Sequence, residues 1–393
     1  MSLRRSGWYG VALLLAAAPA LAQLRPGDAA AVGMSSAGLD RALRLLESEV
    51  RESRLGAASI LVARRGTVVL NRGFGHLSSG AGSPAVEPDS VYVAASLTKP
   101  VTATALMILV ERGKVSLQEP VSTYLPEFTG GERDKVRVVD LLTHTSGLPD
   151  QLPEIGELFR AHAPLSEFVK HTYTTPLLFT PGTAWHYQSM GVLLAAEIVA
   201  RVSGVPLADF EQKEIFEPLG MKHSALGLGR MRIGDTVQVQ DDSNNEPLPL
   251  GSNDLTARDV NSGYWRSLGN PWGGMHTTTM DMAILLQTFL DGGSYGGKRI
   301  LNPTTVKAMT SDQNAHLNAA WGLGWRLGGS SGKDLGDLIS PNAFGHMGST
   351  GNMEWADPET QVICVILSNR PLLLDKGLFL RLVSNAVAAA VTK

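Results

Sequence analysis

Apolar positions recur along this 393-residue chain with a helical period in some stretches and as β-branched runs in others. From Ser36 onward they return every three or four residues, which predicts an amphipathic helix that ends before Gly56. The β-branched runs 58–63 and 67–71 follow across a short turn and predict an antiparallel hairpin. A loop rich in Gly, Ser and Pro covers 75–84.

The run 101–110 is apolar on every side, which predicts a helix buried at the centre of the molecule. Beyond it, helical patterns alternate with long Pro/Gly loops as far as about residue 290, and the acidic, Asn-rich stretch 241–246 predicts a solvated loop. The clearest helices in this region cover 192–202, 207–216 and 280–290. Three strands and a last apolar helix are then predicted over 321–327, 344–356, 362–367 and 378–391.

Strands at both ends of the chain with helices between them predict an α/β fold of the α+β type. The N- and C-terminal segments would form one antiparallel sheet flanked by helices, and a mostly helical region would be inserted between its strands. We expect a single domain over 36–393. Its sheet subdomain would cover about 36–95 and 292–393, its helical subdomain would cover about 96–291, and a cleft would lie between the two.

The first residues have the pattern of a secretory signal. Arg4 and Arg5 precede an apolar run over 11–18, and Ala20-Leu21-Ala22 fits the small-residue rule for cleavage. We expect a signal peptide over 1–22, a linker over 23–35, and a periplasmic or secreted protein without a stable membrane span once the signal is removed. An uncleaved anchor is the alternative.

The composition limits the classes of partner and cofactor that this chain is expected to bind. The chain has 34 Lys and Arg against 37 Asp and Glu, a net charge of −3, which argues against nucleic acid. Cys364 is the only cysteine and lies in an apolar run, so we expect a buried thiol and no intrachain disulfide. The nine histidines lack metal-ligand spacing, so we expect no metal and no other cofactor. Nothing in the sequence indicates the oligomeric state.

Ser96 and Lys99 stand at the start of the buried helix, three residues apart and therefore on one face. A serine hydroxyl is a weak nucleophile until a neighbour takes its proton, and a helix N-terminus favours developing negative charge. The pair therefore suits a nucleophile beside a basic amine, although an N-cap serine and a solvated lysine would show the same spacing.

Tyr187 follows the Pro181-Gly182 turn just before a predicted helix. A tyrosine acts as a general base only if nearby cations lower its pKa, and moving it from 10 to 7 requires about 4 kcal/mol. We therefore treat Tyr187 and Lys99 as one coupled base. A packing tyrosine is the alternative.

The stretch 344–351 carries three glycines, which in a strand mark the close approach of a ligand or another backbone. If this strand borders the cleft, the backbone N–H of Ser349 would pair with that of Ser96 to hold an oxyanion. His346 and Gly348 would contact the substrate there.

These three stretches, with Ser189 two residues after Tyr187, resemble in order and separation the motifs of the serine β-lactamase and penicillin-binding-protein superfamily. The resemblance is strongest to its branch of class C β-lactamases, D,D-carboxypeptidases and family VIII esterases. Further similar stretches are 141–148, 216–221 and 273–275. The resemblance covers roughly 36–390 and implies an acyl-enzyme on Ser96, with Lys99 and Tyr187 as base and proton shuttle and His144 as a structural residue.

Two departures bear on the substrate. Ser189 replaces the usual asparagine of the second motif and lacks its amide donor, and His346 replaces the lysine of many lactamases, so a fixed charge for a substrate carboxylate is missing. Both changes favour a neutral small-molecule ester or acyl substrate, and hence a carboxylesterase. A D,D-carboxypeptidase or class C-like β-lactamase is the alternative within enzymes, and a non-catalytic penicillin-binding sensor or binding module is the alternative outside them.

Gly-x-Ser-x-Gly, the nucleophile elbow of another hydrolase class, occurs at 292–296 and 328–332. Neither copy stands between a predicted strand and a predicted helix, so we expect neither Ser294 nor Ser330 to be a nucleophile.

Overall fold

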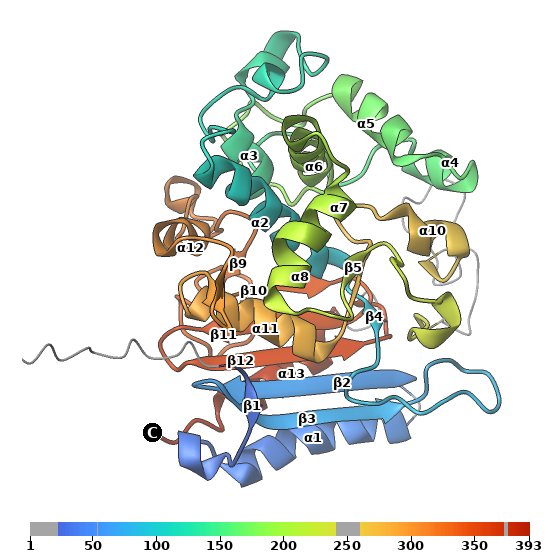
Figure 1. Cartoon of the computed structure of the whole chain (residues 1–393), viewed down its shortest axis with the longest axis vertical. Coiled ribbons are helices and arrows are strands. Elements are labelled where there is room, and N and C mark those ends of the chain that lie inside the picture. The colour runs from blue at the N-terminus through green and yellow to red at the C-terminus, as the bar shows by residue number, and fades with distance from the viewer. Residues whose placement is uncertain (1–22, 53, 241–259, 373–375) are drawn as a thin grey trace, which may run out of the picture.

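The computed structural model describes residues 23–52, 54–240, 260–372 and 376–393. The predicted signal peptide over 1–22 and the predicted solvated loop over 241–246 lie outside the described residues. The main element is a seven-stranded sheet in the order β1-β3-β2-β12-β11-β10-β9 (Figure 1). Its strands are β1 (Arg25–Pro26), β2 (Ala57–Arg64), β3 (Thr67–Gly75), β9 (Arg326–Leu327), β10 (Phe344–Gly348), β11 (Asn352–Asp357) and β12 (Val362–Ser368).

Both ends of the chain contribute to this sheet, as the sequence predicts. β2 from the N-terminal part pairs antiparallel with β12 from the C-terminal part, and Val62 lies opposite Cys364. The remaining neighbouring strands of this sheet also pair antiparallel, and only β1 with β3 is parallel. The predicted α/β class is therefore confirmed, with one parallel pair at an edge. Cys364 is fully buried, as expected of an inert thiol.

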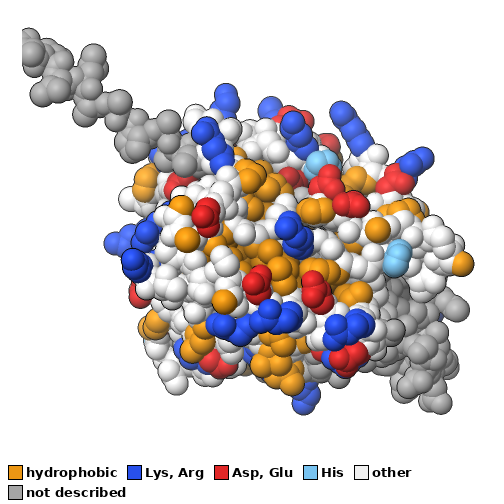
Figure 2. Space-filling view, turned by 90° about the horizontal axis from the view of Figure 1, so that it is seen from below, with side chains coloured by type: hydrophobic (Ala, Val, Ile, Leu, Met, Phe, Trp, Pro, Cys, Tyr) orange, Lys and Arg blue, Asp and Glu red, His pale blue; other side chains and the backbone are white. Residues whose placement is uncertain are grey.

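Helices cover both faces of the sheet. α1 (Ser36–Arg51) and α13 (Leu378–Ala388) pack together on one face, where the Ser35 hydroxyl caps α1 by accepting from the Gly38 N–H. α11 (Thr279–Leu290) covers the opposite face of β2, β11 and β12. Viewed from the α1 side, hydrophobic side chains form a band across the surface, bordered by intermixed charges of both signs (Figure 2).

The region between the two sheet-forming segments is mainly helical. α2 (Thr98–Glu111) runs through its centre and is buried from Thr98 to Leu109, which is why its pattern is apolar on all sides. α6 packs along α2. The other helices are α3 (Val138–Thr143), α4 (Ile155–Arg160), α5 (Leu165–Thr174), α6 (Met190–Ser203), α7 (Leu207–Glu211), α8 (Glu217–Leu219), α10 (Gly263–Leu268) and α12 (Pro303–Met309).

Several local expectations differ from the structure. The predicted strand over 344–356 is two strands, because Gly351 with φ +97° turns the chain between β10 and β11. Of the predicted strand over 321–327, only the last two residues belong to the sheet. The predicted linker over 23–35 is not detached, because β1 pairs with β3 and Met34 bridges to Val391.

Short strands are a further feature that periodicity did not reveal. β4 (Tyr92–Val93), β5 (Ala225–Leu226) and β6 (Met275–Thr277) form a three-stranded sheet beside α2, and β7 (Ser294–Tyr295) pairs with β8 (Lys298–Arg299). Strands of two or three residues are too short to show a period in the sequence.

Within the described ranges, no single helix combines the length and the apolar composition needed to cross a membrane. One bent pair, α6 with the helical stretch Leu207–Leu219, meets that test only when its two parts are taken together across a 76° bend.

Candidate active site

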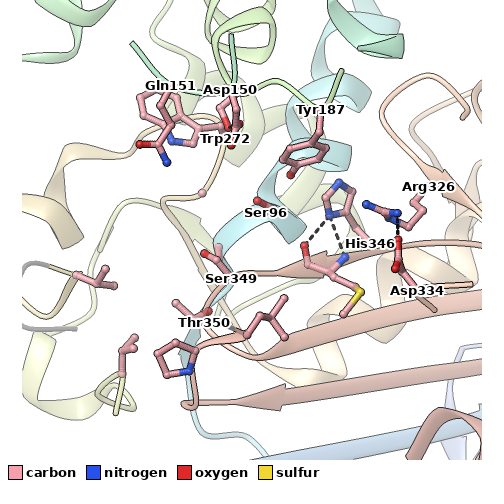
Figure 3. A pocket seen from close by; sticks show the side chains of 18 of the residues that line it. Ser96, Asp150, Gln151, Tyr187, Trp272, Arg326, Asp334, His346, Ser349 and Thr350 are labelled. Atoms are coloured by element: carbon pink, nitrogen blue, oxygen red, sulfur yellow. Dashed lines mark hydrogen bonds and ion pairs between the residues drawn. The ribbon is translucent and has the colours of Figure 1, made fainter. Parts of the chain in front are cut away.

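A pocket of about 520 Å³ opens where the start of α2 meets the turn after β10 (Figure 3). Its wall contains residues that are far apart in the sequence, and in this view Tyr187 and Ser349 lie on opposite sides of Ser96. Five of the seven predicted site residues line it, namely Ser96, Tyr187, Ser189, His346 and Ser349. The other two, Lys99 and Gly348, lie directly behind that wall, as their contacts show below.

Ser96 stands on a tight turn that continues into α2. Ala95–Leu97 is a 3₁₀ turn, and Ala95 has φ +49°, a left-handed conformation that a non-glycine residue rarely adopts. The Thr98 hydroxyl stabilises the turn by donating to the Ala95 carbonyl over 2.7 Å, while Thr98 Oγ1 accepts from the Met275 N–H over 3.1 Å. The turn therefore presents Ser96 at the N-terminal end of a buried helix.

Lys99 lies one turn further along α2, beneath Ser96. Its Nζ is 2.9 Å from Ser96 Oγ and 2.9 Å from the carbonyl oxygen of Trp272. Lys99 is only 1% exposed, and this burial lowers the pKa of its amine to about 8, against the opposing effect of the Asp150 carboxylate. A neutral amine able to accept the Ser96 proton is thus accessible near neutral pH.

Tyr187 contacts the same serine from the other side. Its hydroxyl points toward Ser96 (Figure 3), and its ring centroid lies 4.8 Å from Lys99 Nζ. Burial and the Asp150 carboxylate raise the pKa of Tyr187 above its usual value. A tyrosine that acts as a base by itself would need a lowered pKa, so the direction of this shift argues against Tyr187 as an independent base. Tyr187 is a protonated phenol and a hydrogen-bond donor.

His144 holds the tyrosine segment in place. Its carbonyl accepts from the His186 N–H over 3.0 Å, its Nδ1 accepts from the Gln188 N–H over 3.2 Å, and its ring lies 4.7 Å from that of Tyr187. Burial lowers the pKa of His144 well below its usual value, so the imidazole is neutral and can accept at Nδ1. These contacts fit the structural role expected for His144.

β10 approaches the Ser96 turn closely. A Cβ atom added at Gly348 would lie 2.5 Å from the Ala94 carbonyl oxygen, so only glycine fits there. The side chains of Thr350 and Asn352 both donate to the Val93 carbonyl, over 3.1 and 2.7 Å. The turn that carries Ser349 therefore lies beside the turn that carries Ser96.

His346 is 1% exposed on the same strand. Its Nδ1 lies 2.7 Å from the oxygen and 3.0 Å from the nitrogen of the Met347 backbone, and its Nε2 has no hydrogen-bond partner among the described residues. Burial, with Lys99 and Arg326 nearby, lowers the pKa of His346 well below its usual value, so it is neutral at pH 7. Directly opposite on β11 lies Glu354, a fully buried carboxyl group.

Four charged residues in the pocket were missed from the sequence, namely Asp150, Arg326, Asp334 and Lys376. Asp150 accepts a hydrogen bond from the Ser189 hydroxyl over 2.6 Å. Arg326 pairs with Asp334 and lies 5.0 Å from the ring centroid of Trp321. Lys376 also lies on the wall, so two cations line the pocket although His346 at the third motif adds no charge.

The signals for these residues were weak. Asp150 lies two residues after the stretch 141–148 and Trp272 directly precedes the stretch 273–275. Both of these stretches resemble the family, so the sequence had already marked their surroundings. Arg326 stands in no such stretch. The alternative nucleophiles are elsewhere, because neither Ser294 nor Ser330 lines the pocket. In the part of the chain that the structure describes, no three His, Cys, Asp or Glu side chains gather as a metal site would require.

Comparison with known proteins identifies relatives over most of the chain. The sequence profile of the family described as Beta-lactamase matches residues 43–382. A protein of Salmonella schwarzengrund (strain CVM19633), named as a candidate D-alanyl-D-alanine carboxypeptidase, is 30% identical over 371 residues, covering 86% of this chain and 84% of that protein.

Two solved structures share the fold. A penicillin-binding protein homologue from Caulobacter crescentus superimposes with a TM-score of 0.75 at 22% identity, covering 91% of this chain and 99% of that one. A family VIII carboxylesterase superimposes with a TM-score of 0.73 at 21% identity, covering 90% of this chain and 98% of that one.

Proposed function

Because this chain belongs to the beta-lactamase family, and is thus a serine hydrolase of the β-lactamase and penicillin-binding-protein superfamily, we propose that it is a carboxylesterase. In this proposal it hydrolyses short-chain esters through an acyl-enzyme on Ser96. The observation that carries the proposal is that the Ser96 hydroxyl lies 2.9 Å from the buried amine of Lys99, while the Tyr187 hydroxyl points toward the same serine.

Acylation follows from the protonation states of these groups. The neutral Lys99 amine takes the Ser96 proton as Oγ attacks the ester carbonyl, and the backbone N–H groups of Ser96 and Ser349 stabilise the oxyanion. Tyr187 then donates its proton to the departing alkoxide and regains one from the Lys99 ammonium. In deacylation, water gives a proton to the Lys99 amine as it attacks the acyl carbonyl. The bond from the acyl carbon to Ser96 Oγ then breaks, the acid leaves, and Oγ takes the proton back from Lys99.

Ester substrates are favoured by what the second and third motifs offer. The Ser189 hydroxyl already donates to Asp150, so it is engaged within the protein and not free for a substrate amide. His346 is neutral and adds no charge for a substrate carboxylate. One part of the wall is apolar and suits a short acyl chain or alkyl group; it comprises Val239, Val260, Trp265, Trp272, Pro371 and Leu372.

A D,D-carboxypeptidase, or a class C-like β-lactamase, is the second candidate, and one observation favours it. Arg326 and Lys376 line the pocket, and either cation could attract a substrate carboxylate. Arg326 is already paired with Asp334, which reduces this attraction and leaves the ester proposal ahead.

Turnover assays decide between these candidates. We expect purified protein to hydrolyse p-nitrophenyl acetate and butyrate over many turnovers, faster than a chromogenic cephalosporin or an acyl-D-Ala-D-Ala peptide. Ser96→Ala should abolish this activity, whereas Ser294→Ala should not. Faster hydrolysis of the lactam or the peptide would favour the second candidate. A stoichiometric burst without turnover would favour the non-catalytic sensor.

We also propose that the protein is periplasmic or secreted, on the basis of the signal-like residues 1–22. Cell fractionation with N-terminal sequencing tests this. We expect the mature chain to begin directly after Ala22. A full-length chain found only in the cytosol would overturn the proposal, and a full-length chain in the membrane fraction would indicate the uncleaved anchor.

A further inference from the structure

Glu211, the last residue of α7, is a buried acid close to the active-site helix. It is 0% exposed, its Oε1 lies 3.2 Å from Thr102 Oγ1, and its Oε2 has no hydrogen-bond partner among the described residues. Burial raises the pKa of Glu211 to about 8, opposed only by the hydrogen bond with Thr102. The group is therefore a neutral carboxylic acid at pH 7.

Thr102 connects this acid to the loop beside the active site. It stands on α2, one turn beyond Lys99, and its Oγ1 lies 2.8 Å from the carbonyl oxygen of Pro271. The next carbonyl along the chain is that of Trp272, which accepts from Lys99 Nζ over 2.9 Å. Two adjacent carbonyls of one loop are thus held by two side chains on the same face of α2.

A count of protons assigns the directions of these bonds. A threonine hydroxyl has one proton, and a proline carbonyl can only accept, so the shorter contact requires Thr102 to donate to Pro271. The contact between Thr102 and Glu211 must then be donated by the carboxylic acid. An ionised carboxylate would instead draw the Thr102 proton away from the loop.

We propose that Glu211, as a neutral acid, is a positioning residue for Lys99: it donates to Thr102, which in turn holds the loop whose carbonyl accepts from the catalytic amine. This inference rests on the proposed function, in which Lys99 is the base. The chain of contacts fixes both the orientation of the amine and one of its hydrogen bonds. Glu211 itself touches neither the pocket nor the substrate.

Glu211→Leu tests the donor. We expect kcat/KM for p-nitrophenyl acetate at pH 7, where Glu211 is neutral, to fall about tenfold when measured per fluorophosphonate-reactive site and per neutral Lys99 amine, because a displaced carbonyl misorients the amine. The alkaline-rising limb should also shift by about 0.5 to 1 pH unit toward lower pH, since the ammonium form loses an acceptor. A partly unfolded sample would lower the rate without moving the rising limb of the pH–rate profile, because the pKa of Lys99 in the folded molecules would stay the same.

Glu211→Gln provides the rescue, because a neutral amide also donates to Thr102. We expect its kcat/KM at pH 7 and its limb to match those of the unmodified protein. Thr104→Val is the matched control: it removes another buried hydroxyl of α2, one that bonds only within the helix, to the Pro100 carbonyl over 2.7 Å. It should leave both quantities unchanged.

Two results would overturn the inference: Glu211→Leu with an unchanged kcat/KM at pH 7 and an unchanged limb, or Glu211→Gln as defective as Glu211→Leu. If Glu211→Leu does not fold, Thr102→Val against Thr102→Ser decides, since only the serine keeps the relaying hydroxyl, and equal behaviour of the two would refute the relay. If the unmodified protein does not turn over the ester, the proposed function fails on its own. The relay is then judged from the pH dependence of fluorophosphonate labelling of Ser96 in the same variants.

Discussion

Lys99 Nζ and Ser96 Oγ lie 2.9 Å apart at the base of the pocket, and Lys99 is 1% exposed. Burial lowers the pKa of the amine to about 8, so its neutral, proton-accepting form increases as the pH rises through that value. We therefore expect kcat/KM for p-nitrophenyl acetate to rise with pH along one limb with an apparent pKa near 8 and to level off above it. A pH–rate profile from 5.5 to 10 measures this.

The histidines make this prediction specific. Burial lowers the pKa values of His144 and His346 well below 6.5, so neither should produce a limb in the measured range. A limb near 6.5 that disappears in His346→Asn would assign the base to histidine and contradict the role of Lys99.

Asp150→Asn should move the limb. The Asp150 carboxylate raises the pKa of Lys99, so removing its charge stabilises the neutral amine and shifts the limb toward lower pH. The asparagine carbonyl can still accept from the Ser189 hydroxyl, which keeps the local hydrogen bond. The same pH–rate profile measures the shift. Glu132→Gln, a change at an exposed carboxylate paired with Lys135, is the control and should leave the limb in place. A shift toward higher pH would refute the electrostatic account.

Tyr187→Phe should lower kcat about 10²-fold with little change in KM, because it removes a proton donor to the leaving group while keeping the ring. The raised pKa of Tyr187 makes this donor role the expected one. Steady-state kinetics with p-nitrophenyl acetate and an alkyl ester of a poorer leaving group measure it, and the poorer leaving group should suffer more. Tyr173→Phe removes a hydroxyl that bonds Arg201 instead and serves as the control. Equal losses for both esters would argue against leaving-group protonation.

Gly348→Ala should impair catalysis more than folding. The added methyl group would lie 2.5 Å from the Ala94 carbonyl and push β10 away from the Ser96 turn. A displacement of about 1 Å between the backbone N–H groups of Ser96 and Ser349, which hold the oxyanion, costs about 10² in rate. Kinetics and thermal melts measure the two effects. Gly263→Ala, where a Cβ atom meets nothing within 4 Å, is the control. An active Gly348→Ala enzyme would show that the close approach is not needed.

Glu354→Gln should change how stability depends on pH. Burial raises the pKa of Glu354 well above 4.5, so in the native protein its favourable contribution is complete below pH 4.5 and is lost as the pH rises toward the folded-state pKa. The loss is up to about 1.4 kcal/mol per pH unit, and glutamine does not titrate. Denaturant unfolding at pH 5 and pH 8 should show the variant gaining stability relative to the unmodified protein at the higher pH. A pH-independent difference would mean that Glu354 titrates normally.

The sequence predicted the elements that depend on short-range pattern. The helix after Ser96 and the strands β2 and β12 are continuous apolar runs in the sequence, and each is buried almost throughout. The strand expected over 344–356 failed as one element because the run Gly348-Ser349-Thr350-Gly351 is a turn signal that the prediction did not use. The short strands of the small sheet failed because they have too few residues to show a period.

For the candidate site, the sequence by itself determined the local pairing of Ser96 with Lys99, because three residues of helix place both on one face whatever surrounds them. The motifs around Tyr187 and His346 also marked these two residues as candidates. Only the tertiary structure decided the protonation states and the neighbours: the Asp150 carboxylate, the Arg326 cation and the contacts from Glu211 to the loop of Trp272. Burial and charge depend on segments that are far apart in the sequence, and their packing leaves no mark in the local spacing from which motifs are read.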